Sequence, residues 1–151
     1  MIRIATISDR NLLNTMFTEF YTSDAVLHSI PQAYHETALD ELFSPASRQR
    51  AYLLEDGETP VGYALISEKF SHEAGGMELW VEELYLREAA RGKGFGSAFF
   101  RCLLETAQKE GIARVRLEVE PENTRAALLY AKLGFQTLPY NQMAWTPEGT
   151  V

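Results

Sequence analysis

Hydrophobic residues recur along this chain with spacings that alternate between those of strands and those of helices. Five runs are typical of strands, at residues 3–7, 50–55, 61–67, 78–86 and 114–119. Helical spacing predicts helices from Ser8 or Asp9 to about Phe20, and at 38–43, 96–110 and 121–133. A hairpin turn is indicated at Asp56-Gly57, and a strand pair is predicted at 135–140 and 142–146. This order of elements predicts an α/β fold built on one mixed sheet.

The strand predicted at 78–86 contains a change of parity. Leu79 and Val81 share one parity, whereas Leu84 and Leu86 share the other. In a regular strand this change would place half of the apolar residues on the wrong face. A β-bulge at Glu82-Glu83 would restore one apolar face, and bulges often lie beside active sites. The alternative is a strand that is covered on both faces, for which parity does not matter.

A basic, glycine-rich loop follows this strand and leads into a helical pattern. It consists of Arg91, Gly92, Lys93, Gly94, Phe95, Gly96 and Ser97. Glycines allow backbone N–H groups to approach a ligand closely, and a helix N-terminus favours an anion. Two cations in this loop stand out in a chain whose net charge is −7. We therefore expect a pyrophosphate to bind here.

Two other nucleotide-binding motifs fit this loop less well. A Walker A loop needs Gly-x-x-x-x-Gly-Lys-Ser/Thr, which the segment does not contain. Gly92, Gly94 and Ser97 approach the dinucleotide fingerprint, with Glu118 at a suitable distance. The loop begins after residue 90 of 151, however, and this leaves too little chain for a full dinucleotide-binding domain.

Length and composition limit the remaining possibilities. We expect residues 1–151 to form one domain. The acidic balance argues against a nucleic-acid partner, and no apolar run reaches the roughly 18 residues of a membrane helix. Cys102 is the only cysteine, which fits a cytoplasmic protein without an internal disulfide. His28, His35 and His72 lack metal-ligand spacing, so no metal site is predicted.

Two motifs, in matching order, resemble those of the GCN5-related N-acetyltransferase (GNAT) family. Arg91, Gly94 and Gly96 form the pattern Arg-x-x-Gly-x-Gly, which is similar to the acetyl-CoA motif of that family. The segment Asn123-Thr-Arg-Ala-Ala-Leu-Leu-Tyr-Ala-Lys-Leu-Gly-Phe135 resembles the second signature, Asn-x-x-Ala-x-x-x-Tyr-x-x-x-Gly-Phe. The resemblance covers about residues 79–135.

The resemblance implies a GNAT-like fold and acetyl-CoA as co-substrate, without a metal. Its central mixed sheet would be splayed between the fourth and fifth strands, with helices on both faces. The pantetheine arm would pair with Leu84 and Leu86 in the splay, and the amides of residues 92–97 would hold the pyrophosphate. Asn123 would belong to the cofactor-binding residues.

Catalytic roles also follow from the resemblance. The strand Val81-Glu82-Glu83-Leu84-Tyr85-Leu86 is similar to that of spermidine/spermine and other diamine acetyltransferases, in which the first acid acts as a base, through water. This predicts Glu82 as the base for direct acetyl transfer. Tyr130 matches the tyrosine that protonates the departing CoA thiolate. The alternatives are that Glu83 is the base, that both acids only attract a cation, and that Tyr130 is a core residue.

The acceptor is predicted only as a primary amine. A diamine, a polyamine or another small cationic amine is favoured, with Tyr21, Trp80 and Glu83 as candidate substrate contacts. Peptide amines remain an alternative, as does a non-catalytic module that binds CoA or a nucleotide as a sensor. The resemblance also suggests a homodimer.

Overall fold

The computed structural model describes residues 1–23, 26 and 29–147. His28, one of the histidines without metal-ligand spacing, lies outside the described residues. The chain divides into two compact units, Met1–Glu118 and Val119–Val151, and each is described by itself.

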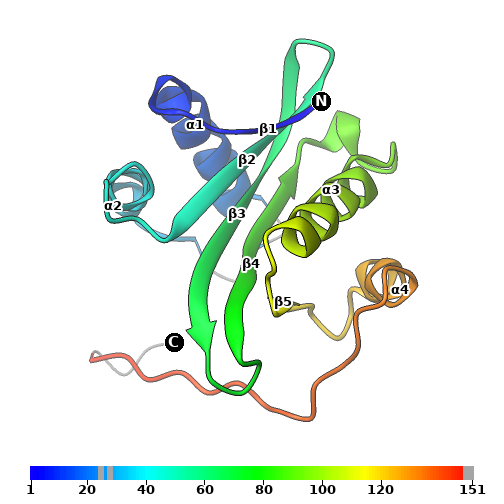
Figure 1. Cartoon of the computed structure of the whole chain (residues 1–151). Coiled ribbons are helices and arrows are strands. Elements are labelled where there is room, and N and C mark those ends of the chain that lie inside the picture. The colour runs from blue at the N-terminus through cyan, green and yellow to red at the C-terminus, as the bar shows by residue number, and fades with distance from the viewer. Residues whose placement is uncertain (24–25, 27–28, 148–151) are drawn as a thin grey trace. The chain divides into compact units, whose positions relative to one another are not determined.

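The first unit is built on a five-stranded sheet in the order β1-β2-β3-β4-β5 (Figure 1). Its strands are β1 (Ile2–Ile4), β2 (Gln49–Asp56), β3 (Thr59–Ser71), β4 (Gly76–Leu86) and β5 (Arg114–Leu117). The first four strands pair antiparallel with their neighbours, and β5 pairs parallel to β4. The predicted mixed sheet is therefore confirmed. β3 and β4 run further than predicted, because the chain between them turns within residues 72–75.

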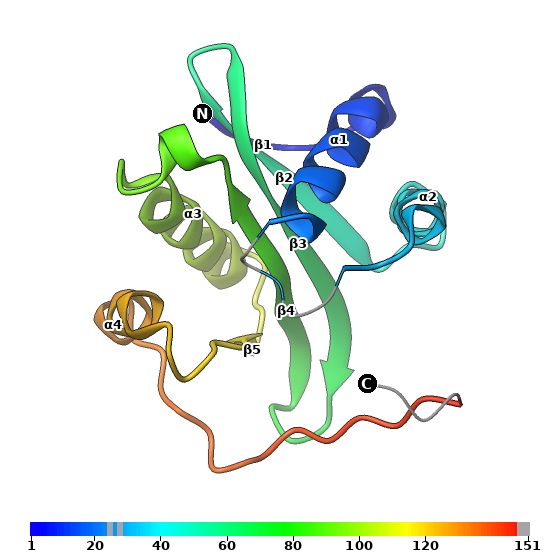
Figure 2. The ribbon, with the colours of Figure 1, turned by 180° about the vertical axis from the view of Figure 1, so that it is seen from behind.

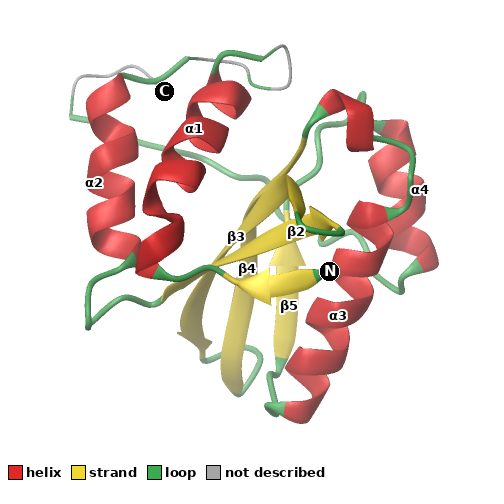
Figure 3. Cartoon of the chain, turned by 90° about the horizontal axis from the view of Figure 1, so that it is seen from above, coloured by secondary structure: helices red, strands yellow, loops and turns green. Residues whose placement is uncertain are grey.

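Helices cover both faces of this sheet, as predicted. The α-helices of the unit are α1 (Arg10–Tyr21), α2 (Gln32–Leu42) and α3 (Phe95–Lys109). α1 and α2 lie on one face and α3 lies on the other (Figures 2 and 3). α2 begins earlier than the predicted helix at 38–43. Its first turns were not predicted because His35 is the only buried residue in the first two turns, and the apolar pattern there is weak.

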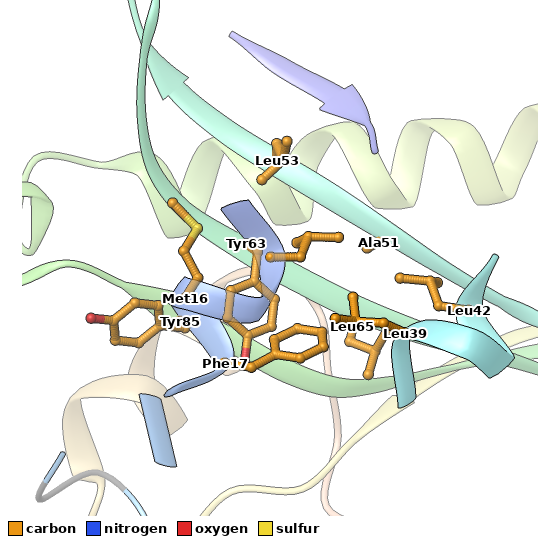
Figure 4. Close-up of a cluster of buried hydrophobic side chains, with 10 residues drawn as sticks. Met16, Phe17, Leu39, Leu42, Ala51, Leu53, Tyr63, Leu65 and Tyr85 are labelled. Carbon is orange, nitrogen blue, oxygen red and sulfur yellow. The ribbon is translucent and has the colours of Figure 1, made fainter. Parts of the chain in front are cut away.

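Alternating side chains of β2 contribute to both layers. Ala51 and Leu53 pack with α1 and α2, whereas the ring of Tyr52 lies 5.7 Å from the ring of Phe99 on α3. The buried cluster between the sheet and the helices α1 and α2 is shown in Figure 4. It consists of Leu13, Met16, Phe17, Leu39, Leu42, Ala51, Leu53, Tyr63, Leu65 and Tyr85. Burial on both faces fixes the central strands, and with them the position of β4.

β4 contains the predicted β-bulge. Two consecutive residues of β3 pair with Val81 and Glu83, so Glu82 has no partner on β3. The extra residue returns Leu84 and Leu86 to the face that carries Val81. The parity change in the sequence is therefore resolved by an insertion rather than by burial on both faces.

The sheet opens at the same place. β4 and β5 pair only between residues 78–81 and residues 114–117. β4 continues to Leu86, and its last five residues, 82–86, have no partner on β5. The splay between the fourth and fifth strands is thus confirmed, and it begins at the bulge.

The second unit contains α4 (Thr124–Lys132). Asn123 caps this helix, and its side-chain oxygen accepts a hydrogen bond from the Ala126 N–H at 3.1 Å. The predicted strand pair at 135–140 and 142–146 is wrong, because residues 135–147 are irregular. Pro139 has no N–H to give to a strand ladder, which weakens pairing in this segment.

Candidate active site

The open half of β4 presents backbone groups away from β3. The Arg87 N–H donates to the Val61 oxygen of β3 at 2.9 Å. Because backbone groups alternate along a strand, those of Leu84 and Leu86 point to the opposite edge. The Leu86 oxygen accepts a hydrogen bond there from Arg91 Nε at 3.0 Å. The edge predicted to pair with a ligand is therefore exposed as a strand edge beside the glycine-rich loop.

The glycine-rich loop forms the start of α3. Gly92 and Gly94 have φ angles of 78° and 88°, a conformation that residues with a Cβ rarely adopt. A Cβ added to Gly96 would lie 3.7 Å from Leu84 Cδ2 and 4.0 Å from Leu86 Cδ1, so the start of α3 packs against side chains of the open half of β4. Among the described residues, the N–H groups of residues 94–97 donate to no protein atom. They form a cradle suited to an anion.

Glu82 lies at the bulge, where the sheet opens. Its side chain is exposed, and one carboxylate oxygen accepts a hydrogen bond from the Ser67 hydroxyl of β3. This leaves the rest of the carboxylate accessible to water or to a substrate.

Glu83 is held by two tyrosines. The Tyr21 hydroxyl of α1 donates to Glu83 Oε1 at 2.6 Å, and the Tyr63 hydroxyl donates to Glu83 Oε2. Burial, and then the neighbouring Glu83 carboxylate, raises the pKa of both tyrosines well above the usual value. The structure thus brings Tyr21 and Glu83 together, and both oxygens of Glu83 are already engaged.

A second carboxylate ties α1 to the end of β4. Glu19 accepts hydrogen bonds from Arg87 Nε at 2.9 Å and from a terminal nitrogen of Arg87 at 2.8 Å. The Tyr85 hydroxyl donates to the same carboxylate at 3.2 Å. The Arg87 guanidinium lowers the pKa of Glu19, so this contact is ionic at neutral pH.

Trp80 lies on β4 two residues before the bulge and is flanked by cations. Arg116 Cζ lies 4.7 Å from the centre of its ring, and Lys69 Nζ lies 5.5 Å from it. Sequence analysis selected Trp80 as a substrate contact but missed both cations. The only sequence signal for Arg116 is its alternation with Arg114 along a short strand.

Asn123 and Tyr130 belong to the second unit. Tyr130 lies on α4, and its ring centre is 5.9 Å from that of Phe135. Burial raises the pKa of the Tyr130 hydroxyl, which is therefore protonated at neutral pH.

Comparison with known proteins places the chain among acetyltransferases. Residues 11–135 match the family described as Acetyltransferase (GNAT) family. This chain belongs to the GNAT family. The matched residues include β4, the glycine-rich loop and α4.

Two curated GNAT relatives differ in the amine that their names specify. Thialysine N-epsilon-acetyltransferase of Bos taurus is 32% identical over 105 residues, which cover 70% of this chain and 57% of the relative. A candidate ribosomal protein bS18-alanine N-acetyltransferase of Bacillus subtilis (strain 168) is 28% identical over 99 residues, which cover 61% of this chain and 66% of the relative. The chain therefore spans less than two thirds of the length of either relative.

A solved GNAT structure shares the fold. AAC(6')-Iy, in complex with the bisubstrate analogue CoA-S-monomethyl-acetylneamine, aligns with a TM-score of 0.79 and 13% identity, over 97% of each chain. Within the part of this chain that the structure describes, no group of three or more His, Cys, Asp or Glu side chains is placed to hold a metal ion. No helix in that part is long and apolar enough to cross a membrane.

Proposed function

We propose that this chain is an acetyl-CoA-dependent N-acetyltransferase that transfers an acetyl group directly to a primary amine of a small molecule. The observation that carries the proposal is the position of Glu82. This exposed carboxylate lies where β4 leaves β5, at the start of a free strand edge that runs to the amide cradle of the loop. A thioester bound along that edge and an amine beside the carboxylate would meet at the opening.

The residues present suit acetyl-CoA. Free amides of the loop and the cations Arg91 and Lys93 match a pyrophosphate, and the backbone groups of Leu84 and Leu86 match the amides of a pantetheine arm. Acetyl-CoA would supply the activated acetyl group. The Leu84 N–H would polarise the thioester carbonyl, and Asn123 is proposed as a further cofactor-binding residue.

Glu82 is proposed as the base, acting through water. A primary amine has a pKa of about 10.4, so its neutral form costs about 4–5 kcal/mol at pH 7. A carboxylate that is open to solvent can relay the proton through water. Glu82 meets this condition, whereas both oxygens of Glu83 accept tyrosine hydroxyls. Glu83 is therefore proposed to hold α1 against β4 and to add negative charge beside the acceptor.

Tyr130 is proposed as the acid that protonates the CoA thiolate. Its hydroxyl is protonated at neutral pH, as an acid requires. Tyr130→Phe keeps the ring and removes only the hydroxyl, so kcat is expected to fall about 10²- to 10⁴-fold with little change in acetyl-CoA affinity. The kcat of the variant and of the parent would be compared by release of free CoA at a saturating concentration of one amine. An unchanged kcat would contradict the assignment of Tyr130 as the acid.

The proposed acceptor is a small cationic amine. The charge of Glu82 and Glu83 favours a cation, and the name of the Bos taurus relative specifies a side-chain amine. Diamines, polyamines and amino acids with an amine in the side chain all belong to this class. The Bacillus subtilis relative, whose name specifies an alanine of a ribosomal protein, supports a peptide amine as the alternative.

A binding assay followed by an acceptor panel tests the proposal. Acetyl-CoA at 100 times its dissociation constant should stabilise the protein by about 2.7 kcal/mol, and NAD should not stabilise it. Small amines and peptides with a free N-terminus would then be compared by release of free CoA. Acetyl-CoA binding without turnover of any amine would favour the sensor alternative, and stabilisation by NAD alone would contradict the cofactor assignment.

A further inference from the structure

Three cations and two carboxylates gather where β4 pairs with β5. Glu78 is fully buried, and its Oε2 accepts a hydrogen bond from Arg114 Nε. The other two Arg114 nitrogens donate to Glu73 at 3.0 Å and to Ser71 at 3.0 Å. Glu78 Oε1 lies 3.3 Å from Lys69 Nζ and 4.0 Å from a terminal nitrogen of Arg116. Within the described residues, the ion pairs of Lys69, Arg114 and Arg116 are formed with Glu73 and Glu78, so these five side chains together carry one surplus positive charge.

Arg116 is the arginine of this cluster whose hydrogen-bond donors are available. Arg114 uses three nitrogens, whereas no hydrogen bond from the Arg116 guanidinium is formed within the described residues. The Arg116 guanidinium lies over the Trp80 ring at 4.7 Å, and this contact fixes its position. A planar guanidinium with free donors is suited to bind a carboxylate through two hydrogen bonds.

Lys69 of β3 is a second cation beside Trp80. Its ammonium lies 5.5 Å from the Trp80 ring, and its side chain is 56% exposed. Trp80 thus has one cation from β3 and one from β5 beside its ring.

The cation pair lies on the same face as the proposed base. Ser67 is the register partner of Trp80, and its hydroxyl donates to Glu82. Arg116 is the register partner of Trp80 on β5. Trp80 and Glu82 are two positions apart on β4, and at about 3.3 Å per residue this places the two sites up to about 7 Å apart along the strand.

We infer that the acceptor carries a carboxylate about 7 Å from its reacting amine, and that Arg116 and Lys69 bind this carboxylate beside Trp80. The inference rests on the proposed function and specifies its substrate class: an amino acid with an amine in its side chain, rather than a diamine. The distal ammonium of a diamine would meet Lys69 and Arg116, and like charges would repel it. A carboxylate in that position would instead use the donors of Arg116 and offset the surplus charge.

Matched substrates test this inference on the unaltered protein. Lysine and cadaverine have the same chain and reacting amine, and they differ only in the carboxylate. Because a hydrogen-bonded charge pair contributes a factor of about 10 to 100, we expect kcat/KM for lysine to exceed that for cadaverine by about this factor. The acetyl group should be found on the side-chain nitrogen of lysine. Equal or faster turnover of cadaverine would overturn the inference and leave the N-acetyltransferase proposal intact.

A pair of arginine variants tests the residue assignment. Arg116→Gln should lower kcat/KM for lysine about 10- to 100-fold, mainly through KM, and should leave cadaverine unchanged or improved. Retained cadaverine turnover shows that the variant is folded. Arg101→Gln is the matched control, because Arg101 is exposed on α3, on the opposite face of the sheet. An equal loss for both substrates in Arg116→Gln would contradict a carboxylate subsite.

Binding provides a readout that does not depend on turnover. Titration of lysine and cadaverine into the protein saturated with desulfo-CoA should give tighter binding of lysine, and Arg116→Gln should remove the difference. This result without acetylation of either amine would support the subsite while the proposed function fails. Equal binding of the two amines would overturn the subsite, whatever the turnover.

Discussion

The two halves of β4 carry the same kind of residue in opposite environments. Residues 78–81 pair with β3 on one edge and with β5 on the other, and Glu78 there is fully buried among cations. Residues 83–86 pair with β3 alone, and Glu82, at the bulge between the two halves, is exposed, with Ser67 as its hydrogen-bond donor. One strand thus supplies a buried structural carboxylate and an accessible one only four residues apart.

Backbone pairing accounts for this difference. Where both edges of β4 are bonded, neighbouring strands place Lys69, Arg114 and Arg116 around Glu78 and exclude water. Where β5 diverges, the second edge and its side chains become available to a ligand. The comparison predicts that replacing Glu82 affects chemistry with little effect on folding, and that replacing Glu78 affects folding with little effect on cofactor binding.

The largest expected effect is the loss of turnover in Glu82→Gln. If Glu82 relays the proton of the amine, kcat/KM should fall about 10²- to 10⁴-fold at neutral pH, with the loss shrinking as rising pH supplies the neutral amine. The unfolding free energy should stay within about 0.5 kcal/mol of the parent value, as for an exposed residue. The pH–rate profile and urea unfolding measure the two quantities, and an unchanged profile would mean that Glu82 only attracts the substrate.

The reverse effect is expected for Glu78→Gln. Removing the buried charge leaves three partly exposed cations without their shared partner, so the unfolding free energy should fall by about 1–3 kcal/mol. Acetyl-CoA affinity of the folded protein should not change, because the cofactor edge begins at residue 82. Urea unfolding measures the unfolding free energy, and titration with acetyl-CoA measures the affinity. Loss of cofactor affinity without loss of stability would contradict the assignment of Glu78 to a structural role.

The smallest effect is expected for Tyr21→Phe, which removes one of two hydroxyls that hold Glu83. We expect a loss of about 1 kcal/mol in unfolding free energy near pH 7. The folded-state pKa of both tyrosines is raised, so their contribution to stability is complete below the unfolded value near 10 and is lost as pH rises above it. The parent protein should therefore lose stability above pH of about 10, and Tyr21→Phe should lose it less steeply. Parallel alkaline curves for the two proteins would contradict the Tyr21–Glu83 contact.

The open half of β4 was predictable because its signals are local. The parity change between Val81 and Leu84 indicated a bulge at Glu82-Glu83, and the structure places the extra residue at Glu82. The glycine-rich loop likewise depends on residues that are adjacent in the chain.

The features missed by sequence analysis depend on contacts between distant segments. The flanking of Trp80 by Lys69 and Arg116 follows from the register of three strands, which no local pattern encodes. The erroneous strand pair at 135–146 has the opposite cause. Its apolar alternation is local, but a strand needs a partner as well as a pattern, and Pro139 limits the pairing.

The bulge at Glu82 also has an evolutionary consequence. The residue that interrupts pairing with β3 is the one whose carboxylate lies at the opening, so its backbone and its side chain serve separate purposes. Deleting it would shift the register and turn Leu84 and Leu86 to the other face, whereas replacing it would keep the open edge. If the proposed function is correct, one substitution at this position is therefore enough to abolish catalysis and keep binding of the same cofactor.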